Sequence, residues 1–234
     1  MSEKHVCVIG AGRHSTANLY PVLLSLGDVV IDAVCTRHLE VAQETAGKCG
    51  RQTRAYDSID EMLEKETCGT VIICVPGVVS AATASKCLEK GWNVFCEKPL
   101  GMSLQEACYI DDICERSGTF YMTAYMKKFA PVYRSIREAV DKQTYGSVLS
   151  YRGAFNVDAS RFCKTDRDFM YFVAIHFLAL VRFLFGKPER ITVVCNPKEA
   201  AGAITSCYSI PATSSARSNS KTEVPGPKST RAWT

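Results

Sequence analysis

A buried strand that runs directly into a glycine turn limits most strongly what this chain can fold into. The strand is predicted at His5-Val6-Cys7-Val8-Ile9, the turn at Gly10-Ala11-Gly12, and a helix at 13–26. Strand, glycine turn and helix in this order are the context of the dinucleotide-binding fingerprint. Gly10 permits the tight turn, and Gly12 lets the backbone approach a pyrophosphate at the helix N-terminus.

The same turn carries the first predicted cofactor contacts. Arg13 and His14 open the helix, where unpaired N–H groups and the helix dipole favour an anion. Ser15 stands at the third position of the G-x-G-x-x-G pattern, so the helix must pack on its strand around a small side chain. An ordinary glycine turn without a ligand is the alternative interpretation.

Apolar strands and helical stretches alternate over the first 125 residues. Further strands are expected at 29–35, 53–55, 70–75, 93–96 and 120–125, and helices at 39–48, after a capping box at 58–61, at 80–90 and at 103–117. This alternation predicts βαβ units and a parallel sheet covered on both faces. The fold class is therefore α/β, with an N-terminal Rossmann domain, a doubly wound parallel sheet, at 1–125.

The end of the second strand bears on the choice of cofactor. Thr36 and Arg37 stand where NAD-binding folds place an acid for the ribose 2′-hydroxyl. An arginine there can accept a 2′-phosphate, which favours NADP and leaves NAD as a second option. The alternative is that Arg37 is a solvated side chain opening the next helix.

Two strand ends place polar groups at the expected ligand edge. Pro99 cannot donate to a sheet ladder, so the strand before it leaves Glu97 and Lys98 at its carboxyl end. Val75 and Pro76 end the preceding strand in the same way. A surface lysine after a strand is the plain alternative for Lys98, and Glu97 is given only a supporting role.

The pattern changes after residue 125. A helix is expected up to about residue 142, a half-exposed strand at 147–157, an apolar helix at 169–185 and a strand at 190–195. These elements predict an incomplete α+β second domain at 126–195. Residues 196–234 lose hydrophobic periodicity and are expected to be a low-complexity, disordered tail, most clearly over 214–230.

Composition and charge limit the kinds of ligand, partner and cellular compartment that fit this chain. The net charge of +4 suits an anionic ligand but is not a nucleic-acid footprint. The 12 cysteines are scattered without a C-x-x-C pair, and no secretory signal opens the chain, so we expect reduced, mostly buried thiols, no metal site and a cytoplasmic location. His176 and Arg182 interrupt the apolar helix, which favours a buried core helix over a membrane span.

With these residues placed, the chain resembles the Gfo/Idh/MocA oxidoreductases over about Val6 to Val194. The resemblance rests on the glycine turn, the Pro76 strand end, the stretch Phe95-Cys96-Glu97-Lys98-Pro99-Leu100, the segment 124–131 and the helix with His176. It implies a Rossmann domain followed by a substrate domain, and hydride transfer between NAD(P) and a sugar, polyol or related small molecule.

The resemblance also implies roles for individual residues. Lys98 matches the lysine beside the nicotinamide and the substrate hydroxyl, and His176 matches the histidine general acid/base. Lys127 and Lys128 fall where a basic pair lines the site, although a solvated pair fits them equally. From the residues alone His176 reads as a core histidine, and Tyr125 either reaches the site or packs.

Several residues depart from the family pattern. Phe172 stands where an aspartate precedes the histidine, and Ala179 replaces an acid after it. Gly77 and Ser80 replace an asparagine and a histidine. The chain is also about a hundred residues shorter than the family implies, so the second sheet is expected to be incomplete.

Three functions follow as hypotheses. The first is an NADP-dependent oxidoreductase acting on a sugar-like or small hydroxyl/carbonyl substrate. The second is a non-catalytic, truncated nucleotide-binding protein that retains the Rossmann domain. The third is a regulatory or homo-oligomeric module that uses an exposed apolar helix face as its interface.

Overall fold

The amino-terminal half of the molecule is a six-stranded parallel sheet. The computed structural model describes residues 3–155, 157–159, 161–188, 190–195 and 204–209. The strands are β1 (Lys4–Ile9), β2 (Val29–Cys35), β3 (Arg54–Tyr56), β4 (Thr70–Ile73), β5 (Asn93–Cys96) and β6 (Tyr121–Thr123). Their order is β3-β2-β1-β4-β5-β6, all parallel. The doubly wound sheet is thereby confirmed, and its order reverses between β1 and β4.

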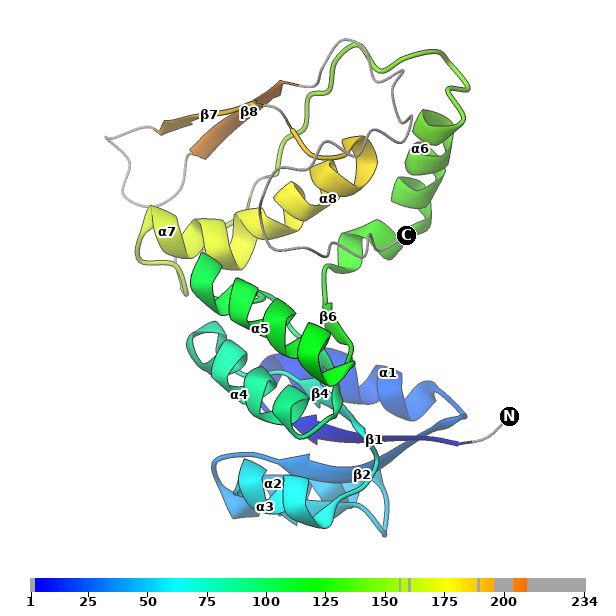
Figure 1. Ribbon diagram of the computed structural model, residues 1–234, viewed down its shortest axis with the longest axis vertical. Helices are drawn as coiled ribbons and strands as arrows, with labels where there is room; N and C mark the ends of the chain where they lie inside the picture. The colour runs from blue at the N-terminus through cyan, green and yellow to red at the C-terminus, as the bar shows by residue number, and fades with distance from the viewer. Residues whose placement is uncertain (1–2, 156, 160, 189, 196–203, 210–234) are drawn as a thin grey trace.

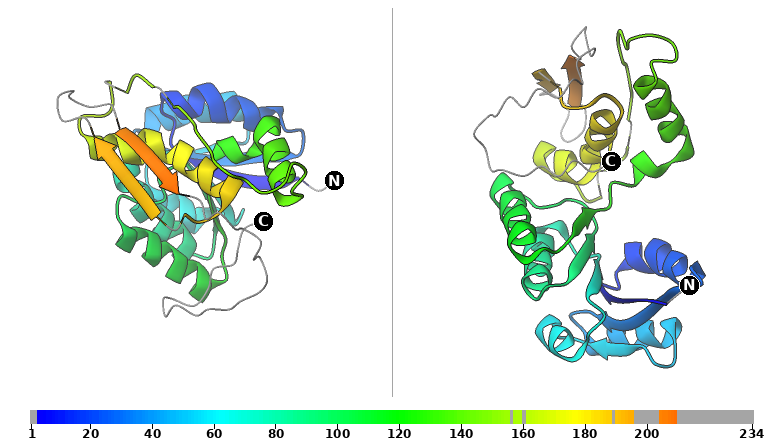
Figure 2. Two further views of the ribbon diagram at one scale, coloured as in Figure 1. Left: turned by 90° about the horizontal axis from the view of Figure 1, so that it is seen from above. Right: turned by 45° about the vertical axis from the view of Figure 1, so that its right-hand side comes forward.

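Helices cover both faces of this sheet (Figure 1, Figure 2). The hydrophobic layer on one face includes α1 (Tyr20–Ser25) and α2 (Leu39–Cys49). The layer on the other face includes α3 (Ile59–Lys65), α4 (Gly77–Glu89) and α5 (Leu104–Ser117). Burial on both faces explains why the central strands are continuously apolar rather than alternating.

The first helix contains a π-helical turn. Helical backbone begins at Arg13, and η1 (Ser15–Leu19) is π-helical before α1. Pro21 has no N–H to donate to the carbonyl four residues earlier, and the N–H of Tyr20 reaches the Ser15 carbonyl instead. The predicted helix at 13–26 is therefore confirmed, with a local widening that the sequence analysis did not anticipate.

One helix starts earlier than expected, and one starts as expected but with half of its capping box changed. Helix α4 begins at Gly77, three residues before the predicted Ser80, because Pro76 fits the cap position and its carbonyl accepts from Val79 N–H at 3.0 Å. At the predicted capping box, Ser58 Oγ accepts from Glu61 N–H at 3.3 Å. The Glu61 carboxylate accepts from Lys65 Nζ at 2.5 Å, so the reciprocal half of the box is replaced by an i,i+4 ion pair.

The second part of the chain mixes helices with an antiparallel hairpin. Its elements are η2 (Met126–Phe129), α6 (Pro131–Asp141), α7 (Asp166–Phe169), the π-helical η3 (Met170–Ala174), α8 (Ile175–Phe185), β7 (Arg190–Cys195) and β8 (Ile204–Ser209). Strands β7 and β8 pair with each other, and Figures 1 and 2 show this hairpin beside the continuous helix α7–η3–α8. The described residues of this part thus combine helices with an antiparallel pair of strands, as its expected α+β character requires.

Two expectations for this part are wrong. The described residues of 147–157 form no strand, because a strand needs a partner and β7 and β8 are paired with each other. Conversely, β8 lies within the tail that was expected to lack structure, where β7 supplies the missing partner. The stretch 214–230 lies outside the described residues.

The apolar helix is covered on one side. Within the described residues, Asp166–Phe185 is the one helix long and apolar enough to cross a bilayer, a property that core helices share. Phe169, Val173, Leu180, Val181 and Leu184 are buried in the molecule, while most other residues of the helix are half-buried. The expectation of a buried core helix therefore holds for one face of it.

The described cysteines are free thiols. The side chains of ten cysteines are described, and Cys7, Cys35, Cys87, Cys96 and Cys163 are buried. Burial raises the pKa of Cys87 and Cys96 to about 12, so these thiols are inert at neutral pH. The expectation of reduced thiols is met for this described set.

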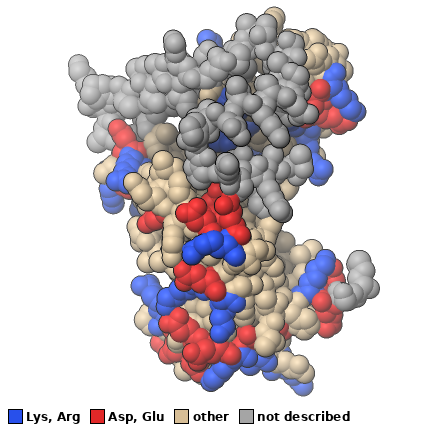
Figure 3. All heavy atoms as spheres, viewed as in Figure 1, with Lys and Arg blue, Asp and Glu red and all other residues tan. Residues whose placement is uncertain are grey.

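Charges of both signs are mixed on the surface. Figure 3 shows lysine, arginine, aspartate and glutamate side chains interleaved over the Rossmann half. A mixed surface of this kind does not present the continuous basic stripe that follows a nucleic-acid backbone.

A buried carboxylate ties β3 to the end of α3. Glu66 is only 5% exposed, and it accepts hydrogen bonds from Arg54 Nε and Nη2 and, at 2.6 Å, from Tyr56 Oη. Burial opposes the charged form, but the hydrogen bonds from Arg54 and Tyr56 outweigh it and hold the pKa of Glu66 below its ordinary value. The cluster therefore stabilises the fold only while Glu66 is ionised.

We expect Arg54→Ala to destabilise the protein by on the order of 3 kcal/mol at pH 7, because it leaves a buried carboxylate without its cation. This loss of stability should shrink as the pH falls below the ordinary pKa of a glutamate. The pKa of Glu66 is lowered in the folded state, so the ionised carboxylate stabilises the fold at higher pH and that contribution disappears as Glu66 is protonated. Urea unfolding at several pH values measures both effects. Lys48→Ala, which removes an exposed ion pair with Glu44, is the control and should leave the urea midpoint unchanged.

Candidate active site

The turn after β1 passes directly against the end of β4. Gly10 has a φ of +108°, and a Cβ there would lie 2.1 Å from the Cys74 carbonyl oxygen. Its N–H donates to the Cys35 carbonyl at 2.8 Å, and Cys74 N–H donates to the Ile9 carbonyl at 2.8 Å. Only glycine fits at this position, because both the backbone conformation and the space exclude a side chain.

The next glycine leaves an open space. A Cβ built on Gly12 meets no atom within 4 Å. The Gly12 carbonyl accepts from the Ser15 and Thr16 hydroxyls at 2.9 and 3.0 Å, and Tyr20 Oη donates to the Gly10 carbonyl at 3.1 Å. The first helix thus fixes the turn through these three hydrogen bonds, while the space next to Gly12 remains open to a ligand.

Ser15 shows how the helix packs without a third glycine. It is fully buried, and its hydroxyl is satisfied by the Gly12 carbonyl. A small side chain with an internal hydrogen bond can replace glycine at a close helix–strand contact.

A cleft of about 420 Å³ lies over this turn at the carboxyl ends of β1, β4 and β5. Its lining comes from the glycine turn, the two strand ends, the segment after β6 and helix α8: Gly12, Arg13, His14, Ser15, Cys74, Val75, Pro76, Glu97, Lys98, Ala124, Met126 and His176. The structure therefore brings together eight of the predicted site residues, Gly12, Arg13, His14, Val75, Pro76, Glu97, Lys98 and His176. Residues Ser15, Cys74, Ala124 and Met126 line it as well; the glycine pattern marks Ser15 as a packing residue, and no local sequence signal distinguishes the other three.

Lys98 reaches from the sheet edge to the second part of the chain. Its Nζ donates to the Phe172 carbonyl at 2.7 Å, and its backbone N–H donates to Glu97 Oε2 at 3.3 Å. Burial lowers the pKa of Lys98 below its ordinary value of 10.5, with the Glu97 charge opposing the shift. A lysine in this state is closer to giving up its proton at neutral pH than a surface lysine is.

His176 faces the same cleft from α8. Its Nδ1 is buried and has no hydrogen-bond partner within the described part of the chain. Burial, followed by the charges of Lys98 and Lys127, lowers the pKa of His176 below its ordinary value of 6.5. A neutral imidazole with a free ring nitrogen beside a lysine is chemically able to exchange a proton with a bound hydroxyl.

His14 and Glu97 close one side of the cleft. His14 Nε2 lies 3.2 Å from Glu97 Oε1, and Asn18 Nδ2 donates to the His14 carbonyl at 3.1 Å. The contact joins the start of the first helix to the end of β5. Glu97 thus has the supporting position that the sequence suggested, between the glycine turn and Lys98.

Thr36 and Arg37 lie outside the cleft lining. Thr36 is fixed by a turn in which its Oγ1 donates to the His38 carbonyl at 2.9 Å and accepts from the His38 N–H. Arg37 is exposed beside it, at the end of β2, which neighbours β1 at the same sheet edge. Both remain predictions as cofactor contacts.

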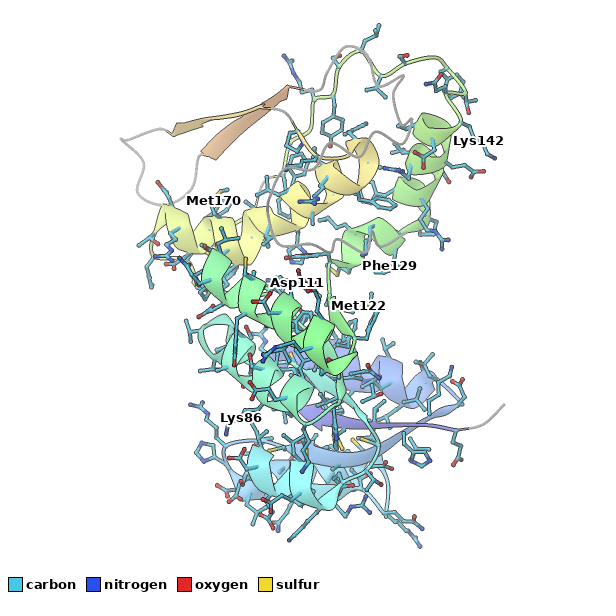
Figure 4. All side chains as sticks on the ribbon, in the orientation of Figure 1. Lys86, Asp111, Met122, Phe129, Lys142 and Met170 are labelled. Carbon is cyan, nitrogen blue, oxygen red and sulfur yellow. The ribbon has the colours of Figure 1, made fainter. Side chains whose placement is uncertain are left out.

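The basic pair after β6 does not line the cleft. Lys127 Nζ lies 4.8 Å from the Phe155 ring centroid, and Lys128 Nζ lies 5.1 Å from that of Phe129. In Figure 4, the labelled Met122 on β6 and Phe129 in η2 bracket this segment. Burial raises the pKa of Tyr125, whose side chain packs rather than lines the cleft.

Phe172 has a structural part in the site. Its ring lies so close to Gly77 that a Cβ on that glycine would be 2.9 Å from Phe172 Cε1 and equally close to Pro99 Cδ. Its carbonyl, within the π-helical segment η3, holds Lys98. The apolar residue thus cannot use its side chain for proton transfer, but its backbone positions the lysine. π-Helical turns recur at functional sites for this kind of reason.

The residues present fit a dinucleotide cofactor. The open space at Gly12 would admit a pyrophosphate at the start of a helix, where Arg13 and His14 add positive or donor groups. The unpartnered His176 Nδ1 on the far side of the cleft leaves a donor or acceptor for a substrate. No group of three or more metal-ligating side chains occurs among the described residues.

Similarity to known proteins agrees with this geometry. Residues 4–125, just over half of the chain, match the family described as "Oxidoreductase family, NAD-binding Rossmann fold". The chain is 27% identical over 180 residues to D-xylose 1-dehydrogenase (NADP(+)) 2 of Haloferax volcanii, covering 74% of this chain and 55% of that protein. It is 28% identical over 169 residues to trans-1,2-dihydrobenzene-1,2-diol dehydrogenase of Mus musculus, covering 69% and 50%.

Among solved structures, a dehydrogenase from Chromobacterium violaceum superimposes with a TM-score of 0.79 at 25% identity, over 91% of this chain and 64% of that one. The chain therefore spans half to two thirds of the length of these relatives. The glycine turn, the strand order and the match over residues 4–125 together show that this chain belongs to the Gfo/Idh/MocA family of oxidoreductases, which has an NAD-binding Rossmann fold.

Proposed function

We propose that this chain binds NADP(H) at the carboxyl edge of its sheet and transfers a hydride between it and a sugar-like or small hydroxyl/carbonyl compound. The observation that carries the proposal is the single cleft in which the Gly12 turn, Lys98 and His176 meet. A cofactor site and two proton-transfer groups in one concave space are what such a reaction needs.

The cofactor would be held by the residues around the turn and the strand ends. Gly10 and Gly12 would leave room for the pyrophosphate, with Arg13 and His14 at the start of the following helix and Val75 and Pro76 at the neighbouring strand end. When bound, the nicotinamide supplies the hydride acceptor or donor. Thr36 and Arg37 lie at the neighbouring strand end, where a ribose 2′-phosphate would be read.

The protein's own groups handle the proton. In the oxidising direction the substrate hydroxyl loses a hydride from carbon and a proton from oxygen, leaving a carbonyl. The proton passes to Lys98 Nζ or to His176, and burial lowers the pKa of each group, which makes loss of its own proton easier than in water. The Phe172 carbonyl holds Lys98 in place before the substrate arrives.

The relatives support the substrate class. One is named for D-xylose and NADP(+), and the other for a trans-1,2-dihydrobenzene-1,2-diol. Both names describe ring or sugar compounds that carry neighbouring hydroxyls. We therefore propose pentoses, cyclic polyols and cyclic diols as the first substrates to test, in a cytoplasmic protein divided at about residue 125.

A non-catalytic nucleotide-binding protein is the second candidate. It is favoured by the side chain of Phe172, which offers no acid, and by a described second sheet of only the two strands β7 and β8. In that case NADPH would bind with no turnover on any of these compounds.

Lys98→Met should leave NADPH affinity within about twofold and reduce turnover by roughly 10²–10⁴-fold, the usual contribution of a positioned acid/base. Fluorescence titration and steady-state kinetics measure the two effects. Lys86→Met is the matched control, because Lys86 is a surface lysine paired with Asp60 at 2.8 Å. Equal turnover in Lys98→Met and wild type would rule out the catalytic role.

Arg37→Ala should weaken NADPH binding by about 10–100-fold and barely change NADH binding, because a charged hydrogen bond to a 2′-phosphate contributes about 1.5–3 kcal/mol. Titration of both cofactors provides the measurement. Arg116→Ala, on the outer face of α5, is the control. A similar loss for NADPH and NADH would argue against 2′-phosphate recognition.

The pH dependence should differ between the two directions. Oxidation requires a neutral base, so its kcat/KM should rise with pH through a pKa below 10.5, while reduction requires the protonated acid and should fall. If protonation of His176 also changes kcat/KM below pH 6.5, His176→Gln should remove that part of the pH profile. Profiles that are flat in both directions from pH 5 to 10 would contradict proton transfer by these groups.

A further inference from the structure

Two thiols meet on the side of the sheet away from the cleft. Cys7 lies in β1, fully buried, and Cys68 lies in the irregular segment between α3 and β4. Their sulfur atoms are 3.3 Å apart, although the residues are 61 positions apart in the sequence. Cys68 Sγ is also 3.3 Å from the Thr70 carbonyl oxygen.

The geometry lets this contact become a bond. A disulfide requires an S–S distance of about 2.05 Å, so the two sulfurs must approach by roughly 1.3 Å. Cys7 is fixed by the strand ladders on both sides of β1. Cys68 is followed by Gly69, at a φ of +69°, and lies between two anchored residues: Glu66 N–H donates to the Met62 carbonyl at 2.9 Å, and the Gly69 carbonyl accepts from Asn93 N–H at 2.9 Å. The adjustment can therefore come from residues 67 and 68 and from the Cys68 side chain.

The two thiols differ in reactivity. The hydrogen bond from Cys7 lowers the pKa of Cys68, while the same contact, together with burial, raises that of Cys7. Cys68 is also the half-buried member of the pair and the one an oxidant can reach. Two carboxylates lie near the pair. The charge of Asp32 raises the pKa of both thiols, and the charge of Glu66 raises that of Cys7. This asymmetry is that of an attacking and a resolving cysteine.

We propose that Cys7 and Cys68 form a reversible redox site that hydrogen peroxide closes to a disulfide. The Cys68 thiolate attacks the peroxide, the O–O bond breaks, and a sulfenic acid and one water are produced. Cys7 sulfur then attacks the Cys68 sulfur, displacing the second water. Two thiols are oxidised by two electrons while one peroxide is reduced to two waters. A small thiol reverses the step by exchange.

The bond would join β1 to the entry of β4 without entering the cleft. Cys7 lies three residues before Gly10, and Cys68 precedes the amino end of β4, whereas the cleft lies at the carboxyl ends. Closing this loop restricts the unfolded chain and raises the unfolding midpoint. The proposal does not depend on the proposed catalytic function, and cofactor affinity should not change.

The test oxidises the full chain with hydrogen peroxide after complete reduction and blocks the remaining thiols with N-ethylmaleimide. Peptide mass spectrometry should find the Cys7 and Cys68 peptides joined, with the loss of two hydrogens, as the main product. The unfolding midpoint should rise by several degrees and return on addition of dithiothreitol. Dimedone should trap a sulfenic acid at Cys68 in Cys7→Ser.

Cys68→Ser should abolish both the joined peptide and the shift in midpoint. Cys68 lies in an irregular segment, so we expect the Cys68→Ser variant to fold. Cys68→Ala provides a second variant. Cys114→Ser, at a partly buried thiol packed on the same core, is the matched control and should behave as wild type. The proposal is overturned if Cys68 is fully alkylated after oxidation, or if the joined peptides involve other cysteines.

Discussion

The carboxyl edge of the sheet depends on one close approach between backbones. Gly10 passes the Cys74 carbonyl at a distance that no side chain tolerates, and backbone hydrogen bonds join the ends of β1, β2 and β4 around it. Because these ends are drawn together at the point where strand order reverses, the helix that follows begins over open space at Gly12. The cleft exists because this approach is so tight.

A second contact connects that edge to the rest of the chain. Lys98 leaves the sheet at the end of β5 and donates to a carbonyl of the π-helical segment that precedes α8. Arg167 donates to the Met102 carbonyl at 3.1 Å nearby, so the helix is held at two points. His176 is thereby brought to Lys98 from 78 positions further along the sequence. The apolar Phe172 helps because its ring, like Pro99, packs closely against Gly77.

Sequence reasoning succeeded where burial fixes the outcome. The strands β2 and β5 and the helix α5 begin and end where their apolar runs, caps and glycines indicated. It failed at 147–157, where alternation alone cannot supply a partner strand, and at β8, where pairing with β7 imposes structure on a polar segment. The lining residues Cys74, Ala124 and Met126 were not predicted, because small and apolar lining residues resemble ordinary core.

The sequence by itself determined the parallel sheet, the glycine turn, and the presence of a lysine at a strand end. Each follows from local rules: periodic burial, the φ that only glycine adopts, and the missing N–H of proline. Only the tertiary structure decided that Lys98 and His176 share a cleft, that Arg37 lies beyond its lining, and that Cys7 touches Cys68. Those relations join residues far apart in the chain, and their distances depend on how whole elements pack.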